Sequence, residues 1–76
     1  MIGLDHMITK NDRRLGKSIK KVRRANKLTQ EQLADKVRVT PKYIQFVEAA
    51  RRKPSLKTLY RIAGALKVKV KDLMPF

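Results

Sequence analysis

The 76-residue sequence contains no cysteine and only one histidine, His6. Disulfide bonds and thiolate metal sites are therefore excluded, and a single imidazole does not build a metal site by itself. We expect a cytoplasmic protein that needs no metal or other cofactor, because a reducing compartment suits a chain that does not depend on disulfides.

The sequence also lacks long hydrophobic runs, since its apolar residues occur in stretches of a few residues whereas a transmembrane helix needs about 20. No signal-peptide pattern opens the chain, so we expect neither membrane insertion nor export. Met7 is a second candidate start. We therefore treat residues 1–11 as a flexible N-terminal arm or a remnant of cloning, and residues 12–76 as one domain.

Acidic residues are scarce, because 6 Asp and Glu stand against 20 Lys and Arg, which gives a net charge of +14. The charge is unevenly spread: residues 10–27 carry nine positive and one negative side chain, whereas residues 28–39 carry two of each. A folded chain that tolerates this much self-repulsion generally has a polyanionic partner. A merely soluble lysine-rich surface is the alternative, and the uneven distribution disfavours it.

Apolar residues recur at intervals of three and four rather than two, which predicts an all-helical domain. Helices are expected at about 12–25, from Thr29, from Thr40, from Pro54-Ser55 to Lys67, and from about Val70 to Pro75. Thr29 with Gln32 fits a capping box, and Thr40 precedes a proline whose missing N–H has no consequence in a first helical turn. The predicted buried stripes are Leu15, Ile19, Val22 and Asn26; Leu33, Ala34 and Val37; and Leu56, Leu59, Tyr60, Ile62, Ala63 and Leu66.

The chain carries, at fixed spacing, Leu28-Thr29-Gln30-Glu31-Gln32-Leu33-Ala34, Val39-Thr40, Tyr43-Ile44, Glu48, Pro54-Ser55-Leu56 and Ala65-Leu66. In these residues it resembles the phage repressor and Cro (XRE-type) helix-turn-helix DNA-binding family over about residues 15–73. The resemblance implies a compact all-α fold, a five-helix bundle of the lambda-repressor type. Its second and third helices would form the helix-turn-helix.

The third helix would bury Ile44 and Val47, and a rotation of 100° per residue identifies the side chains that oppose them. These are Lys42 and Ala49, flanked by Gln45 and Phe46, with Pro41 at the side. In the major groove a lysine donates to guanine, a glutamine pairs with adenine, and an apolar ring covers a thymine methyl. We therefore predict that Lys42, Gln45, Phe46 and Pro41 read bases. The alternatives are a phosphate contact for Lys42, and packing on the core or on a partner chain for Phe46.

Gln30 falls in the first turn of the second helix, where unpaired amides and the helix dipole suit a phosphate. The resemblance implies the same role for this glutamine. The other predicted phosphate contacts are Thr40, Tyr43, Arg51, Arg52 and Lys53. For Tyr43, whose hydroxyl would make the contact, packing beside the core is the favoured interpretation. A basic arm at Lys10, Arg13 and Arg14 would add further contacts with the DNA backbone. The alternative is that these charges are simply solvated.

Arg23 and Glu48 match family positions that form a partly buried ion pair between the first and third helices, which implies a structural role. Relatives generally have glycine where this chain has Lys27, Arg38 and Ala50. A side chain at such a left-handed turn position costs roughly 1–2 kcal/mol. Asn26 is the alternative residue for the left-handed position beside Lys27.

The sequence predicts no enzyme, because it has no cysteine, one histidine and no glycine-rich phosphate loop. It predicts a transcriptional regulator, and more narrowly a repressor, that binds double-stranded DNA sequence-specifically. One recognition helix reads only about four or five base pairs, so a palindromic operator and a homodimer are expected. The predicted contact between subunits is residues 67–76, where Val68, Met74 and Phe76 are apolar.

The main alternative is an interaction protein built on the same domain, such as an antitoxin or a bridging coactivator. Its protein partner, a toxin or a component of the transcription machinery, would matter as much as DNA. A membrane-active cationic peptide is disfavoured, because the apolar and basic faces belong to several short capped helices rather than to one long amphipathic helix.

Overall fold

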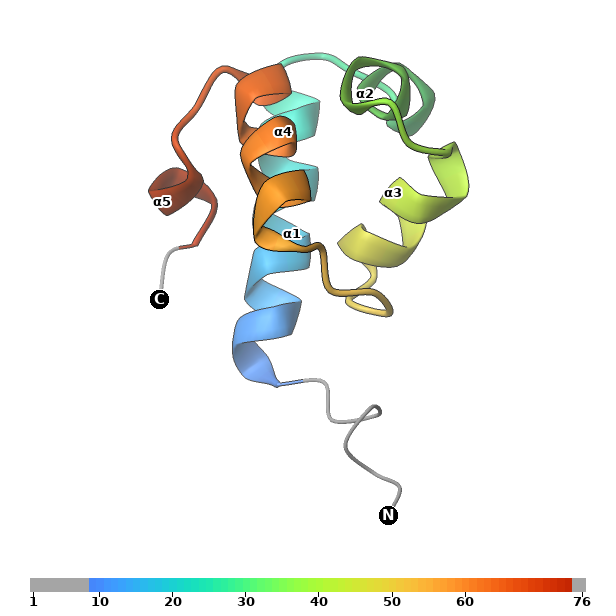
Figure 1. The fold of residues 1–76 in the computed structure, drawn as a ribbon. Coiled ribbons are helices and arrows are strands. Elements are labelled where there is room, and N and C mark those ends of the chain that lie inside the picture. The colour runs from blue at the N-terminus through green and yellow to red at the C-terminus, as the bar shows by residue number, and fades with distance from the viewer. Residues whose placement is uncertain (1–8, 75–76) are drawn as a thin grey trace.

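The computed structural model describes residues 9–74, and all of its regular structure is helical (Figure 1). In chain order the helices are α1 (Lys10–Ala25), α2 (Gln30–Val37), α3 (Pro41–Glu48), α4 (Leu56–Leu66) and α5 (Val70–Leu73). The predicted five-helix bundle is thus confirmed. The interpretations of His6, Met7, Pro75 and Phe76 fall on residues outside the described range.

α1 begins two residues earlier than predicted, because Thr9 caps it. The Thr9 hydroxyl accepts the Asp12 backbone N–H at 3.0 Å, and the Asp12 carboxylate accepts the Thr9 N–H at 3.0 Å. Lys10 and Asn11 therefore belong to the helix rather than to a flexible arm. This boundary was missed because Thr9 and Asp12 form a reciprocal cap that precedes the first apolar residue of the stripe.

The later helix starts lie where the sequence predicts them. The Thr29 hydroxyl accepts the Gln32 N–H at 3.0 Å while the Gln32 side-chain oxygen accepts the Thr29 N–H at 2.9 Å. Thr40 caps α3, with Pro41 in its first turn, and Ser55 caps α4. Because capping is local in sequence, these three boundaries could be predicted without any tertiary information.

The helices pack so that α2 and α3 lie on one side of α1 and α4, with α5 on the other (Figure 1). α1 contacts α3 and α5, while α4 contacts α2 and α5, and α2 contacts α3. All five helices contribute to one core, whose buried members are Ile19, Leu33, Ala34, Val37, Ile44, Val47, Leu59, Ile62, Ala63, Leu66 and Leu73.

The predicted buried face of α4 was too wide. Leu56 and Tyr60 are 64% and 61% exposed, so their assignment to the core was wrong. The residues of α4 that are buried span a narrower arc of the helix, the arc that α2 and α5 cover. Asn26 is likewise exposed rather than part of the α1 stripe, and its side-chain amide donates to the carbonyls of Val22 and Leu66.

Gly16 sets the distance between α1 and α3. A Cβ at this position would lie 2.6 Å from the carbonyl oxygen of Glu48 and 2.8 Å from that of Val47. Real Cβ atoms do not approach backbone oxygens so closely, so only glycine lets the end of α3 rest against α1. The orientation of α3 therefore depends on this buried residue of α1.

Among residues 9–74, four residues other than glycine adopt the left-handed conformation: Lys27, Arg38, Ala50 and Lys67, with φ between 58° and 67°. The first three were predicted from the positions where relatives have glycine. Lys67 was missed, although it too ends a helix, where left-handed residues are common. Asn26 has φ −88°, so the alternative that placed it in the left-handed region was wrong.

Candidate nucleic-acid interface

The outward side of α3 carries the residues predicted to read bases. Ile44 and Val47 are fully buried, so they fix which side of the helix faces the core. Lys42 and Gln45 are exposed on the other side, and Pro41 is exposed at the side of the helix. A cation and a primary amide are thus presented to solvent within the first turns of a short helix, a pair of groups suited to hydrogen bonding with base edges.

Phe46 lies at the edge of this surface. Its side chain is half-buried and lies outside the core cluster. Its carbonyl oxygen accepts the backbone N–H groups of Arg51 and Arg52, at 2.7 and 3.2 Å, where the chain turns after α3. The role of Phe46 in reading bases stays a prediction.

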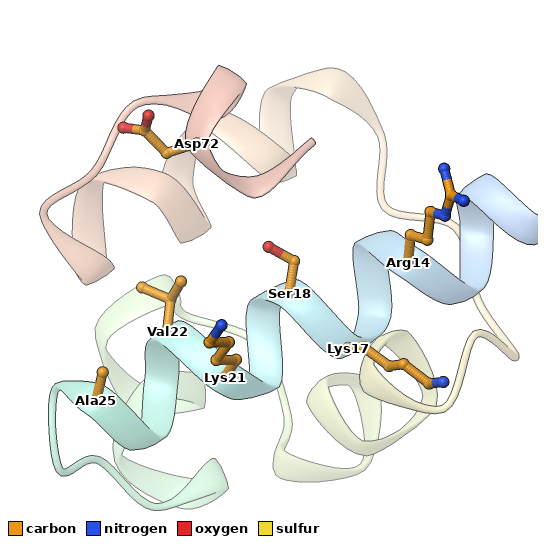
Figure 2. A pocket seen from close by; sticks show the side chains of 7 residues that line it. All are labelled: Arg14, Lys17, Ser18, Lys21, Val22, Ala25 and Asp72. Carbon is orange, nitrogen blue, oxygen red and sulfur yellow. The ribbon is translucent and has the colours of Figure 1, made fainter. Parts of the chain in front are cut away.

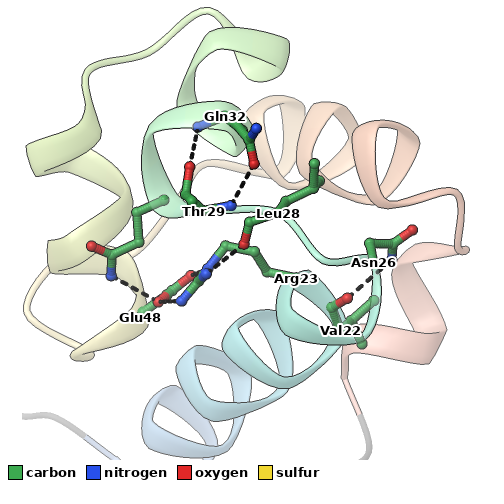
Figure 3. A network of polar contacts seen from close by, with 8 residues as sticks. Val22, Arg23, Asn26, Leu28, Thr29, Gln32 and Glu48 are labelled. Atoms are coloured by element: carbon green, nitrogen blue, oxygen red, sulfur yellow. Dashed lines mark hydrogen bonds and ion pairs between the residues drawn. The ribbon is translucent and has the colours of Figure 1, made fainter.

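The inner side of α3 is held by a buried ion pair. Arg23 donates through Nε to Glu48 Oε2 at 2.6 Å and through Nη2 to Oε1 at 3.1 Å. Figure 3 shows the two side chains facing each other between α1 and the end of α3. A further bond, from Arg23 Nη1 to the Leu28 carbonyl at 2.7 Å, ties the same guanidinium to the start of α2. The structural role expected for this pair fits that geometry.

Gln30 joins the same network, a contact that the sequence did not predict. Its side-chain nitrogen donates to Glu48 Oε1 at 3.0 Å, while the side chain is only partly buried. An amide nitrogen carries two hydrogens, so one hydrogen and the amide oxygen are left for another partner. Glu48 thereby holds Gln30, the residue predicted to bind a phosphate, at the positive end of α2.

Cations follow α3 directly. Arg51, Arg52 and Lys53 are all exposed, as expected for groups that contact a sugar-phosphate backbone. The Arg52 guanidinium lies over the ring of Tyr43, 5.4 Å from its centre. Tyr43 itself is half-buried and packs against the core, as the favoured interpretation had it, and its hydroxyl contact with phosphate stays a prediction.

The start of α1 lies beside this basic turn, because Lys53 Nζ is 3.5 Å from the Asp12 carboxylate. The hydrogen bond from the Thr9 backbone lowers the pKa of Asp12, and the nearby Lys53 ammonium lowers it further. Lys10, Arg13 and Arg14 are exposed residues of α1, so the prediction that they form an arm was wrong. Their charge still lies on the helix whose first turn contacts the basic turn.

Among residues 9–74 no three histidine, cysteine, aspartate or glutamate side chains are placed to share a metal ion. No helix in that part of the chain has the length and apolar character needed to cross a bilayer.

A protein-family model described as Helix-turn-helix matches residues 19–73. Curated relatives are also similar at the sequence level. An immunity repressor protein of Bacillus phage phi105 is 42% identical over 60 residues, which is 79% of this chain and 42% of the repressor. An uncharacterized HTH-type transcriptional regulator of Archaeoglobus fulgidus is 40% identical over 58 residues, which is 76% of this chain and 82% of that protein.

Multiprotein-bridging factor 1 of Candida albicans is also similar, at 39% identity over 84% of this chain and 42% of the factor. The chain thus spans about two fifths of the length of the phage repressor and of the bridging factor. Among solved structures, the restriction-modification controller protein C.AhdI from Aeromonas hydrophila has a TM-score of 0.83 at 28% identity. That similarity covers 86% of this chain and 98% of the controller protein.

Proposed function

The chain belongs to the helix-turn-helix family of DNA-binding transcriptional regulators, and we propose that it is a repressor that binds a palindromic operator as a homodimer. In this proposal α3 enters the major groove of double-stranded DNA in the cytoplasm, and no step of the function is catalytic. The observation that carries the proposal is the exposure of Lys42 and Gln45 on the side of α3 opposite the buried Ile44 and Val47.

Two groups of side chains would position α3 in the groove. Gln30, held by Glu48, would bind a phosphate at the start of α2, with Thr40 at the start of α3 as a second such contact. Arg51, Arg52 and Lys53 would bind the backbone beyond the other end of α3. Contacts on both sides of the groove fix the register of the helix, while Lys42, Gln45, Phe46 and Pro41 discriminate bases.

The homodimer is proposed because one α3 offers too few base contacts for a useful operator. Met74, within the segment predicted to join the subunits, is 37% exposed, and Leu56 and Tyr60 on α4 expose more apolar surface at 64% and 61%. We therefore include the Leu56–Tyr60 pair in the proposed contact. A net charge of +14 on each copy opposes association, so the dimer would form on DNA, which neutralises that charge.

Selection of bound sequences from a random duplex library tests this function. We expect an enriched palindrome whose half-sites lie roughly 10 base pairs apart, centre to centre. Arg51→Gln serves as the control for non-specific attraction, and it should weaken binding to the selected duplex and to a scrambled duplex alike. The dependence of the logarithm of the binding constant on the logarithm of the salt concentration should become shallower by about one. Recovery of no common sequence, with equal affinity for every duplex, would refute a sequence-specific regulator.

A bridging coactivator is the second candidate, and the similarity to multiprotein-bridging factor 1 over 84% of this chain favours it. In that case the same domain would bind a protein of the transcription machinery, and specific DNA contacts would be secondary. The duplex selection separates the two, because a bridging protein without its own operator gives no enriched palindrome. An antitoxin role stays a prediction.

A further inference from the structure

A cationic groove lies between α2 and α4, and its lining excludes every residue assigned above to DNA. The lining residues are Lys36, Val37, Arg38, Arg61, Gly64, Ala65 and Lys67. Four of these seven are cations and none is acidic, while the remaining three form a small, apolar floor. We refer to this feature as the α2–α4 groove.

Two of the four cations occupy strained backbone positions. Arg38 ends α2 with φ 67° and Lys67 ends α4 with φ 60°, both in the left-handed region where glycine is the unstrained residue. Both side chains are exposed, so neither offsets the strain by packing in the core. What each adds over glycine is a positive charge at the rim of the same groove.

Gly64 is an exposed residue in the floor of the groove. It lies inside α4, where glycine is a poor helix former, and a Cβ built on it would meet nothing within 4 Å. The packing of this chain therefore gives no reason for glycine here, in contrast to Gly16. A close approach by a molecule from outside would give one.

A second hollow lies between α1 and α5, and its lining has a mixed character (Figure 2). Arg14, Lys17 and Lys21 line it along α1, but Asp72 lies on its opposite side. The Asp72 carboxylate is already engaged, since it accepts the Lys69 N–H at 2.9 Å. This hollow does not combine an uninterrupted cationic rim with an unexplained glycine, so its cations offer a matched control.

We propose that the α2–α4 groove binds an acidic, amphipathic peptide segment of a protein partner. Carboxylates of the segment pair with Lys36, Arg38, Arg61 and Lys67, and its apolar side chains rest on Val37, Gly64 and Ala65. Charge complementarity selects an anionic ligand. The apolar floor favours a peptide over a nucleic-acid backbone, because a sugar-phosphate chain brings charge without apolar side chains to cover that floor.

The groove shares no residue with the side of α3 proposed to read bases. The rim is built from the end of α2 and from α4, whereas the residues proposed to read bases lie on the outer side of α3. A regulator of this size would thereby present a docking site for another protein while it is on its operator.

The direct test uses a fluorescein-labelled synthetic 16-residue peptide with glutamate and leucine at helical spacing, titrated with the purified protein and followed by fluorescence anisotropy. In the double variant Arg38→Gly/Lys67→Gly we expect roughly tenfold weaker peptide binding, in line with the loss of two partly exposed ion pairs. Gly64→Gln, which fills the floor, should weaken binding by a similar factor. A peptide with serine in place of leucine should bind wild type about tenfold more weakly.

The controls separate this site from general attraction to a cationic protein. Lys17→Gln/Lys21→Gln removes the same charge from the α1–α5 hollow and should change peptide affinity less than about twofold. The thermal midpoint of Arg38→Gly/Lys67→Gly should equal or exceed that of wild type, because glycine relieves both left-handed positions. Operator affinity of Gly64→Gln, which changes neither a proposed DNA contact nor residues 67–76, should stay within about twofold of wild type.

Three outcomes would overturn the proposal. Equal losses in the groove variants and in Lys17→Gln/Lys21→Gln would mean non-specific attraction of polyanions. Loss of duplex affinity without loss of peptide affinity would assign the groove to a DNA backbone. Loss of cooperative operator binding with unchanged peptide affinity would assign it to a second copy of the chain. Each of these results leaves the proposed operator binding through α3 to be judged separately by the duplex selection.

Discussion

The inner and outer sides of α3 meet very different surroundings. On the inner side Ile44 and Val47 are buried, Glu48 accepts hydrogen bonds from Arg23 and Gln30, and the carbonyl oxygens of the last turn rest on α1 at Gly16. On the outer side Lys42 and Gln45 face solvent. The inner side is thus occupied in placing the helix, and the outer side is left for a ligand. Substitutions on the two sides should therefore separate stability from recognition.

The largest loss is expected from Glu48→Ala on the inner side. It leaves the Arg23 guanidinium, whose side chain is 8% exposed, without its carboxylate, and an unpaired buried charge costs about 3–5 kcal/mol. Urea unfolding should show this loss, and DNA binding should fail together with the fold. The control is Glu31→Ala, an exposed acid, which should stay within about 0.5 kcal/mol of wild type. A loss below about 1 kcal/mol in Glu48→Ala would contradict the structural role of the pair.

Gly16→Ala should cause the next-largest loss of stability, because its methyl group must push α3 away from α1. The clash is with backbone carbonyls rather than with a flexible side chain, so we expect a loss of about 3 kcal/mol in the free energy of unfolding. Gly64→Ala is the matched control: its methyl meets nothing, and the better helix former should raise stability by about 0.5–1 kcal/mol. A Gly16→Ala protein that is as stable as wild type, or more stable, would refute the close α1–α3 approach.

Gln45→Ala tests the outer side. We expect a loss of about 1–3 kcal/mol in operator affinity, confined to one base pair of each half-site, because a bidentate amide contact is removed. The free energy of unfolding should change by less than about 0.5 kcal/mol, since the side chain is exposed. Calorimetric titration with operator duplexes substituted at each position measures the first effect and urea unfolding the second. A uniform loss over all positions would make Gln45 a backbone contact.

The smallest effect concerns the junction between α1 and the basic turn after α3. The pKa of Asp12 lies below its ordinary value of 3.8, owing first to the hydrogen bond from the Thr9 backbone. A carboxyl with a lowered folded-state pKa stabilises the fold above the unfolded-state pKa, and that stability is lost as the pH falls through the folded-state value. From pH 7 to pH 5 the free energy of unfolding of wild type should exceed that of Asp12→Asn by a constant margin of about 0.5 kcal/mol.

Below about pH 4 the difference between wild type and Asp12→Asn should shrink towards zero. Urea unfolding of both proteins across this range provides the measurement. A margin that widens as the pH falls would show that the ionised carboxylate does not stabilise this junction.

Local signals explain which parts of the fold were predictable from the sequence. Thr29 and Thr40 mark helix starts through residues within one turn, and the starts of α2 and α3 were predicted correctly. Periodicity also identified the stripe of α2, but it does not say how much of an apolar face the neighbouring helices cover. The exposure of Leu56 and Tyr60 follows from that limit, because it depends on where α2 and α5 pack.

The candidate site was predictable to a similar extent. A rotation of 100° per residue was enough to put Lys42 and Gln45 on the outer side of α3, as the structure does. The bond from Gln30 to Glu48 joins residues 18 positions apart, and no local pattern predicts it. Likewise the α2–α4 groove exists only once the ends of two helices are brought together in the fold.

The most direct test of the account is the ratio of affinities for the selected operator and a scrambled duplex of equal length, measured with wild-type protein at about 0.15 M salt. A sequence-specific regulator should prefer the operator by about 1,000-fold or more. A ratio near one, with affinity that falls steeply as salt is raised, would mean that the charge of +14 accounts for DNA binding and that the outer side of α3 does not read sequence.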